Sequence, residues 1–469
     1  MLLGSYMNYS VHCSKTIVGG SDGCLSNAGR RLLTGALWSM LCAFTAYADP
    51  AAELKVLKSR IDELEKVLEK EREKTDVLVT EVADTKVTRM VPKKKELKSL
   101  YGFGPSASSV YQVDQGISLA GYGEGYYQNI VSDAGSKRDL SDALRTVGYF
   151  GYRFNDWILM NSEIEFEHGS TEGGASGENG SVSVEFSYLD FFLDPAANIR
   201  AGLVLVPMGF INEIHEPAYF HGIQRPEVER YLIPSTWREM GAGLFGKFGN
   251  GFEYRTYLLN GLRANAFSDS GIRDSRQSGA EAITEDLAWV GRLDYTPSDT
   301  IPGLLVGTAL FTGNAGQDDT FGNGSTPSVR TTLFEGHAQY RANGLELRAL
   351  GVWTHIGDAG LVSQQVGSTV GNRQFGWYTE AAYDVLPLFG DPNGHYLAPF
   401  VRYEQLDTQA SVPAGFTSNP LQDRSVYSIG LTYKPITQVA IKGEYRAIET
   451  KSNEEDMPDS IYLGVGFAL

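Results

Sequence analysis

The feature that most constrains this chain is an alternation of apolar and charged side chains, which recurs from about residue 117 to the C-terminus. In residues 157–167, Ile164 and Phe166 fall on one face of an extended strand. Glu163 and Glu165 fall on the other face, because successive side chains of a strand point to opposite sides. A soluble sandwich also alternates, but its buried face needs no row of charges. We infer that the apolar face meets lipid and the charged face meets a water-filled lumen.

The alternation is repeated often enough to close a large sheet. Sixteen segments of this kind begin near residues 117, 143, 157, 181, 198, 236, 252, 286, 303, 329, 344, 374, 396, 424, 437 and 460. Alternating segments separated by polar turns are typical of transmembrane barrels, in which closure removes the unpaired edges that lipid could not satisfy. We therefore predict an all-β fold, a transmembrane antiparallel β-barrel of about 16 strands over residues 117–469.

The first 48 residues have the character of a secretory signal peptide. An arginine pair precedes the apolar run 32–44, and Ala46-Tyr47-Ala48 matches a small-x-small cleavage site. A buried core helix is the alternative, but the run is short and ends in the cleavage motif. We expect residues 1–48 to be a signal peptide with an over-long N-terminus. All three cysteines lie in this part, so the exported chain would have no thiol chemistry.

Residues 49–91 carry a heptad pattern. Large apolar residues recur on alternating three- and four-residue steps, with charged residues between them, at Leu54, Leu57, Ile61, Leu64, Leu68, Leu78 and Val82. The narrow apolar stripe predicts an N-terminal helical coiled coil in the periplasm, a single amphipathic helix packed on a globular domain being the alternative. Pro92 ends the helix, and residues 92–116 are expected to form a basic linker.

One stretch of the barrel resembles a known family. Residues 199–210 contain Gly202, Pro207 and Gly209 in a G-x-x-x-x-P-x-G pattern. This pattern is similar to the strand that leads into the constriction loop of phosphate-selective porins O and P, and residues 225–241 resemble the return of that loop. The whole arrangement resembles this superfamily, especially its coiled-coil-bearing, dicarboxylate-channel-like members. The resemblance implies a homotrimeric passive channel in the bacterial outer membrane.

The longest connection without strand-like alternation is 209–235, which is rich in charge. A charged loop of this length is a natural candidate to fold inward and narrow the pore, an outward surface loop being the alternative. Together with charges on the inner strand faces, it supplies the expected pore-lining and constriction residues: Arg145, Glu163, Glu165, Glu213, His215, Arg225, Glu227, Arg230, Arg255, Arg292, Arg348, Arg402 and Arg446.

The balance of charge bears on the solute. The barrel region holds only five lysines, and its inner faces carry both arginines and glutamates. A mixed lumen suits small polar or zwitterionic solutes and gives at most a weak ion preference, which argues against strict phosphate selectivity. We expect passive diffusion of small hydrophilic solutes, anions among them, through a charged lumen narrowed by the inward loop.

Other functions are disfavoured. The formal net charge of −17 argues against a nucleic-acid partner, which requires a basic face. Residues 117–469 contain no G-x-S-x-G motif, and the spacing of His215 and His221 is no metal signature, so we expect no catalysis, cofactor or metal. The expected partners are outer-membrane lipid, small solutes, further copies of the chain and, through the coiled coil, peptidoglycan. A structural tether contacting the cell wall is the alternative function.

Overall fold

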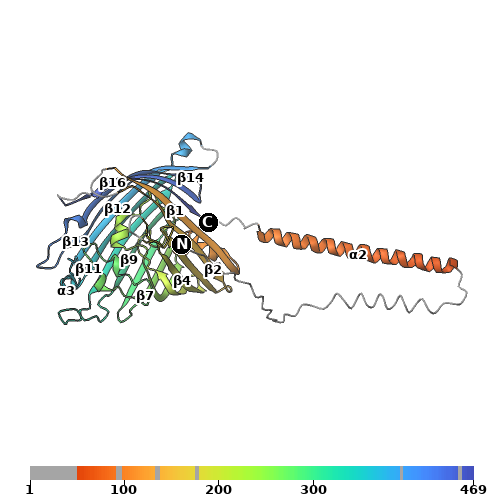
Figure 1. Cartoon of the computed structure of the whole chain (residues 1–469), viewed down its shortest axis with the longest axis horizontal. Coiled ribbons are helices and arrows are strands. Elements are labelled where there is room, and N and C mark those ends of the chain that lie inside the picture. Colours follow the sequence, from red (N-terminus) through yellow and green to blue (C-terminus); the bar gives the residue numbers. More distant parts are fainter. Residues whose placement is uncertain (1–49, 91–97, 132–137, 175–178, 391–393, 453–456) are drawn as a thin grey trace, which may run out of the picture. The chain divides into compact units, whose positions relative to one another are not determined.

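The computed structural model describes residues 50–90, 98–131, 138–174, 179–390, 394–452 and 457–469. The chain divides into two units, Met1–Lys93 and Lys94–Leu469, which are treated separately below (Figure 1). The predicted signal peptide lies outside the described residues.

The first unit contains one long helix, α2 (Pro50–Met90), of 41 residues. It covers the stretch in which the heptads were found. The apolar side chains at the heptad positions are more than half exposed, at Leu54, Leu57, Ile61, Leu64 and Leu68. Such a stripe is the surface that a coiled-coil partner covers, and the association itself stays a prediction. Among the described residues, no helix combines the length and apolarity of a membrane-crossing helix.

The second unit is a barrel of sixteen strands in the described part of the chain (Figure 1). The strands are β1 (Gly116–Ile130), β2 (Leu140–Arg153), β3 (Ile158–Glu167), β4 (Val182–Asp194), β5 (Ala197–Leu205), β6 (Arg238–Phe248), β7 (Phe252–Asn260), β8 (Leu287–Tyr295), β9 (Leu304–Asn314), β10 (Arg330–Ala342), β11 (Leu345–Ile356), β12 (Arg373–Tyr383), β13 (Tyr396–Ser411), β14 (Asp423–Ile436), β15 (Val439–Thr450) and β16 (Met457–Ala468). The shorter helices are η1 (Ala107–Gln112), η2 (Val228–Leu232), η3 (Ala264–Ala266), η4 (Arg273–Ser275), α3 (Ala359–Val366), η5 (Leu386–Phe389) and η6 (Pro420–Gln422).

Each strand pairs antiparallel with its neighbours in sequence, and the first strand closes the sheet on the last. Tyr122 of β1 stands opposite Val147 of β2 on one side and opposite Ala468 of β16 on the other. The prediction of a closed antiparallel barrel of about 16 strands is confirmed. The observed strands begin within three residues of the predicted starts, because the apolar and charged alternation follows the pleat closely.

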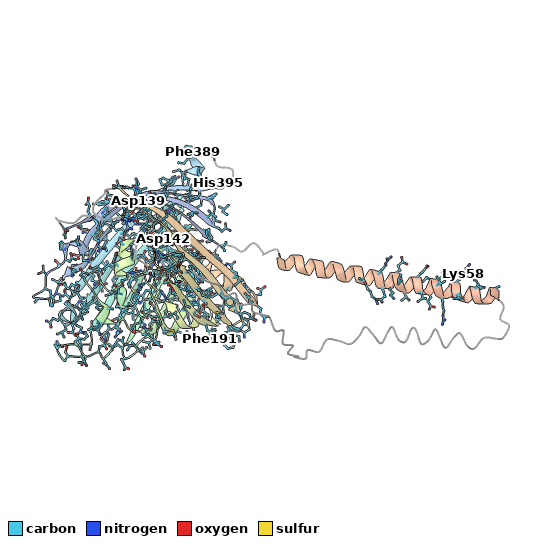
Figure 2. All side chains as sticks on the ribbon, viewed as in Figure 1. Lys58, Asp139, Asp142, Phe191, Phe389 and His395 are labelled. Atoms are coloured by element: carbon cyan, nitrogen blue, oxygen red, sulfur yellow. The ribbon has the colours of Figure 1, made fainter. Side chains whose placement is uncertain are left out.

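The two faces of the wall differ as the alternation predicts. On β3, Ile164 and Phe166 are 39% and 51% exposed on the outside, whereas Glu163 and Glu165 are 0% and 2% exposed on the inside. Most connections at the end where β1 begins are short, while those at the opposite end are long. The β12–β13 connection is the longer exception, and its Phe389 projects at the edge of the barrel (Figure 2).

The interior of the barrel is packed. Aromatic and aliphatic side chains from the strands, from the connections and from residues 98–113 form one continuous buried cluster, which includes Phe103, Phe186, Tyr188 and Trp237. Residues 98–113 of the segment that we predicted to be a basic linker are thus packed inside the barrel. Phe103 is only 3% exposed because the rings of Phe186 and Tyr188 on β4 and the guanidinium of Arg200 on β5 pack against it.

Candidate pore constriction

The β5–β6 loop, residues 206–237, lies inside the barrel. Lys442 of β15 donates hydrogen bonds to the carbonyl oxygens of Phe220 and Gly222, each at 2.8 Å. Lys434 of β14 donates to the carbonyl oxygen of Ala218 at 2.6 Å. Buried carbonyl groups need partners, and these ammonium groups supply them from the lumen face of the wall. These bonds hold the loop against the lumen face of β14 and β15.

A glycine allows the loop to approach this wall closely. Gly222 has φ +75°, and a Cβ atom there would lie 2.9 Å from Oε2 of Glu444 on β15. The same oxygen accepts the backbone N–H of Ile223 at 2.7 Å. A larger residue at 222 would be strained and would displace the carboxylate that receives this N–H.

Arg402 of β13 stands at the centre of the attachment. Its side chain is fully buried and forms ion pairs at 3.2, 3.0 and 3.3 Å with Glu380, Glu404 and Glu444, respectively. It also donates to the carbonyl oxygen of Gln224 at 3.0 Å, while Glu444 accepts the N–H of Gln224 at the same distance. Arg402 thus joins three strands to the loop.

Glu227 forms the second ionic attachment. This loop carboxylate is paired with Arg446 of β15, with Arg424 of β14 at 3.4 Å, and with Arg230 of the loop at 3.8 Å. The Arg230 side chain is nearly half exposed. Glu227, Arg402 and Arg446, which we predicted to line the pore, are therefore engaged in holding the loop.

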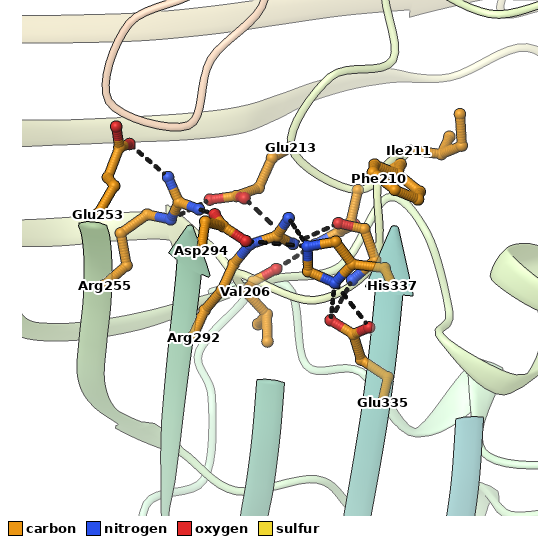
Figure 3. Close-up of polar contacts among 12 residues, drawn as sticks. Val206, Phe210, Ile211, Glu213, Glu253, Arg255, Arg292, Asp294, Glu335 and His337 are labelled. Atoms are coloured by element: carbon orange, nitrogen blue, oxygen red, sulfur yellow. Dashed lines mark hydrogen bonds and ion pairs between the residues drawn. The ribbon is translucent and has the colours of Figure 1, made fainter. Parts of the chain in front are cut away.

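A third ionic network lies below the start of the loop (Figure 3). Glu213 of the loop is 3.1 Å from Arg255 and 3.6 Å from Arg292. Asp294 accepts from Arg292 at 2.9 Å and lies 2.9 Å from Nε2 of His337. Our predicted set contained Glu213, Arg255 and Arg292 but missed Asp294 and His337. The alternation does place both of these on inner faces, whereas their convergence depends on how the barrel closes.

The loop's remaining arginine faces the opposite wall. Arg225 lies near Arg145 of β2, Glu124 of β1 and Glu165 of β3, and among the described residues no acid is within ion-pair distance of it. Arg145 itself pairs with Glu165 at 3.2 Å. One oxygen each of Glu163 and Glu185 has no hydrogen-bond partner among the described residues. Glu185 is paired through its other oxygen with Arg238 at 2.5 Å. Arg225 and Glu163 are therefore the side chains here that have no oppositely charged partner within ion-pair distance among the described residues.

His215 does not add charge to this region at neutral pH. Burial, reinforced by the nearby Arg225, lowers the pKa of His215 from its ordinary value to about 4. Its Nε2 lies 3.2 Å from Oε1 of Glu163. The neutral imidazole therefore acts as a hydrogen-bonding group between the loop and β3.

Open space remains beneath the loop. A cavity of about 320 Å³ is lined by Arg255, Arg292, Arg341 and Arg348 together with acidic and aromatic side chains. Arg348 packs over the ring of Phe210 at 4.9 Å and forms no ion pair among the residues described. Arg348, one of our predicted pore-lining residues, thus faces this cavity and has no acidic side chain paired with it among the described residues.

A buried loop carboxylate sets a pH-dependent contribution to stability. Burial raises the pKa of Glu216 to about 7, although the N–H groups of Ala107 and Ser106 lower it. The folded state therefore binds the proton more tightly than the unfolded state, whose glutamate titrates near 4.5. This contribution is largest below pH 4.5 and is lost as the pH rises through about 7.

We expect Glu216→Gln to remove this dependence. Relative to the wild type, the variant should gain about 1 kcal/mol in free energy of unfolding between pH 6 and pH 8, since only the wild type releases a proton there. Urea unfolding in detergent at both pH values measures the difference. Glu172→Gln, at an exposed position, is the control. If the difference in free energy of unfolding between Glu216→Gln and the wild type were the same at pH 6 and pH 8, the raised pKa of Glu216 would be contradicted.

No family model matches the sequence. A protein of Aquifex aeolicus (strain VF5), described as an uncharacterized protein, is 34% identical to it over 371 residues, covering 76% of this chain and 82% of the relative. The chain belongs to the family of this Aquifex protein. The match extends over most of both family members, so it is not confined to one motif.

Two solved structures were compared with the barrel, and the likeness of the fold rests on the first of them. OmpF of Salmonella typhi, in a complex with daunomycin, is 16% identical and gives a TM-score of 0.50 over 76% of this chain and 98% of OmpF. A BenF-like porin of Pseudomonas fluorescens Pf-5 is 10% identical with a TM-score of 0.41, covering 76% and 98% of the two chains. At these identities the likeness concerns the fold alone. The chain has the barrel fold of outer-membrane porins, and the resemblance to phosphate-selective porins stays a prediction.

Proposed function

We propose that this protein is an outer-membrane channel for passive diffusion of small hydrophilic solutes. The observation that carries the proposal is the closed barrel with an apolar outer face, a charged inner face and a long loop attached inside it. A barrel of about sixteen strands is too wide to be filled by its own wall side chains, unlike barrels of eight strands. The short connections face the periplasm, as in outer-membrane barrels generally.

The solute route runs between the β5–β6 loop and the wall of β1–β4. Because Arg402 of β13 and Arg446 of β15 are engaged in binding the loop, their charges are compensated there. On the other side, Arg225 lies near Glu163 and Glu165 of β3. Opposite charges on two sides of a constriction produce a transverse field, which favours small polar or zwitterionic solutes and weak ion selectivity.

Solute efflux from proteoliposomes tests the proposal. We expect purified protein to release small sugars and amino acids of either charge, at rates that fall with solute size. Liposomes that contain heat-denatured protein are the control for leakage. Retention of every solute, including the smallest, would contradict a diffusion channel.

We further propose that three copies associate and that α2 contributes by forming a coiled coil. The apolar stripe on α2 is exposed in the single chain, and coiled-coil association would remove it from water. At about 1.5 Å per residue, its 41 residues reach roughly 60 Å, which also suits a spacer in the periplasm.

The pair Leu57→Asn/Leu64→Asn tests the coil. These residues occupy the same heptad position, so two buried amides per helix would weaken association strongly. We expect the trimer in detergent to shift towards monomers by light scattering, with the barrel still folded. Lys58→Asn/Glu65→Asn on the adjacent charged face is the matched control. An unchanged mass for the leucine variant would contradict the coil.

A further inference from the structure

We propose that residues 98–113, called the plug below, are an intramolecular ligand of the lumen that must undock before the channel conducts fully. The inference rests on the proposed function, because a plug has meaning only in a conducting barrel. It adds a closing element to that channel, made from the segment that directly precedes β1. The plug contacts the wall through an apolar face and through a polar group, and it also contacts the β5–β6 loop.

The plug buries an apolar face against the wall. Phe103 and Val110 are 3% and 2% exposed. The ring of Phe103 packs against that of Phe186 on β4, with ring centres 5.1 Å apart. Val110 sits over Gly151 of β2, where an added Cβ would lie 2.3 Å from Cγ2 of Val110. Glycine at 151 therefore leaves the hollow in the wall that this side chain fills.

A polar group of the wall receives the other end of the plug. The hydroxyl of Tyr111 lies 2.8 Å from Oδ2 of Asp190 and accepts from Nη2 of Arg200 at 3.0 Å. Arg200 and Asp190 are also joined directly by two hydrogen bonds of 2.8 and 2.9 Å. Asp190 and Arg200 thus remain paired with each other when Tyr111 leaves, so undocking leaves neither of these two buried charges without a partner.

The β5–β6 loop closes over the plug from the other side. Oε1 of Glu216 accepts the backbone N–H groups of Ser106 and Ala107 at 2.9 and 3.1 Å. The approach is close, because a Cβ added at Gly104 would lie 2.4 Å from the same oxygen. Asn161 of β3 completes the contact by donating to the carbonyl oxygen of Ala107 at 2.9 Å.

The plug occupies the route assigned to solute. Glu163 and Glu165, the β3 glutamates near Arg225, are at most 2% exposed. Glu163 belongs to the same strand as Asn161, the residue that binds the plug. Because the plug is bonded both to Glu216 of the loop and to Asn161 of the wall, a solute passing between loop and wall requires the plug to move.

Leaving the site does not require the barrel to open. The registered strand pairs of β1 with β2 and β16 begin at Gly116 or beyond, after the plug ends. The loop, in contrast, is fixed by ion pairs and by charge-assisted bonds to four or more strands. Because the plug lacks ion pairs to the wall among the described residues, it is the more readily displaced of the two elements.

A reversible cross-link tests the plug directly. In Gly104→Cys/Glu216→Cys, the sulfur at 216 would stand close to the Cγ of Glu216, which is 3.1 Å from a Cβ at 104. This separation is within disulfide reach. Diamide joins the two thiols by accepting their two hydrogens, and dithiothreitol restores them. The reduced form also lacks the Glu216 carboxylate, so it holds the plug less firmly than the wild type.

We expect the reduced variant to conduct several-fold more than its oxidised form in planar bilayers, with disulfide formation verified by mass spectrometry. The conductance of the single variant Gly104→Cys and of the wild type should be the same under oxidising and reducing conditions. Phe103→Ala, which empties the apolar part of the site, should raise conductance under both conditions. Equal conductance of the oxidised and reduced forms, or wild-type conductance of Phe103→Ala, would overturn the plug while leaving the channel intact. Silence of all variants and of the wild type would overturn the channel itself and the plug with it.

Discussion

Arg402→Met is expected to destabilise the folded barrel by about 3–5 kcal/mol, the usual loss when one partner of a buried ionic network is removed. The change would leave Glu380, Glu404 and Glu444 without the guanidinium that compensates them. It would also remove the donor to the carbonyl oxygen of Gln224, so the β5–β6 loop should loosen. Reversible urea unfolding in detergent measures the loss.

Two further variants separate this cause from a general effect of losing an arginine. Arg373→Met changes an exposed residue on β12 and should cost little. In Arg402→Met/Glu404→Gln one of the uncompensated carboxylates is neutral, so part of the stability should return. A loss for Arg402→Met no larger than that for Arg373→Met would show that the network does not hold the loop.

Arg225→Ala is expected to make the channel clearly cation-selective. Arg225 has no acidic partner within ion-pair distance among the described residues, and it lies near the buried Glu163 and Glu165 of β3. Removing the guanidinium leaves the constriction with excess negative charge, which attracts cations. A shift of about tenfold in the cation-to-anion permeability ratio would correspond to roughly 1.4 kcal/mol. The reversal potential under a KCl gradient measures it.

Arg230→Ala is the matched control from the same loop. Arg230 is nearly half exposed and stands 3.8 Å from Glu227, so its charge is largely screened or compensated. We expect its removal to leave the reversal potential nearly unchanged. Equal shifts for the two variants, or none for Arg225→Ala, would mean that solutes do not pass between the loop and the β1–β4 wall.

The strands could be predicted from the sequence because the side chains of each strand alternate according to whether they face lipid or the lumen. Ile164 and Glu165 are adjacent, and lipid and lumen select opposite side chains for them. The inward faces of Arg255, Arg292 and Arg402 follow from the same local pattern. No more than this alternation is needed to place a charge inside the barrel.

The roles of those charges could not be predicted in the same way. Arg402 was predicted as a charge on an inner strand face, and Glu227 as a charge of the inward loop. Their roles in holding the loop depend on which strands lie opposite it once the barrel closes. The plug was not predicted from the sequence, for a different reason. Residues around Phe103 are small, interrupted by glycine and proline, and lack any periodicity, so they read as a linker. Only the hollow at Gly151 and the acceptor at Glu216 explain their position.

The most direct test of the channel is the current through single molecules of the purified wild-type protein in a planar bilayer, recorded under a KCl gradient. We expect discrete steps of current, in groups of three if three copies associate, with a small reversal potential that reflects the mixed charge of the constriction. The same recording on reduced Gly104→Cys/Glu216→Cys shows the pore with the plug released. Absence of current steps from both proteins, at every voltage and salt concentration, would contradict the account.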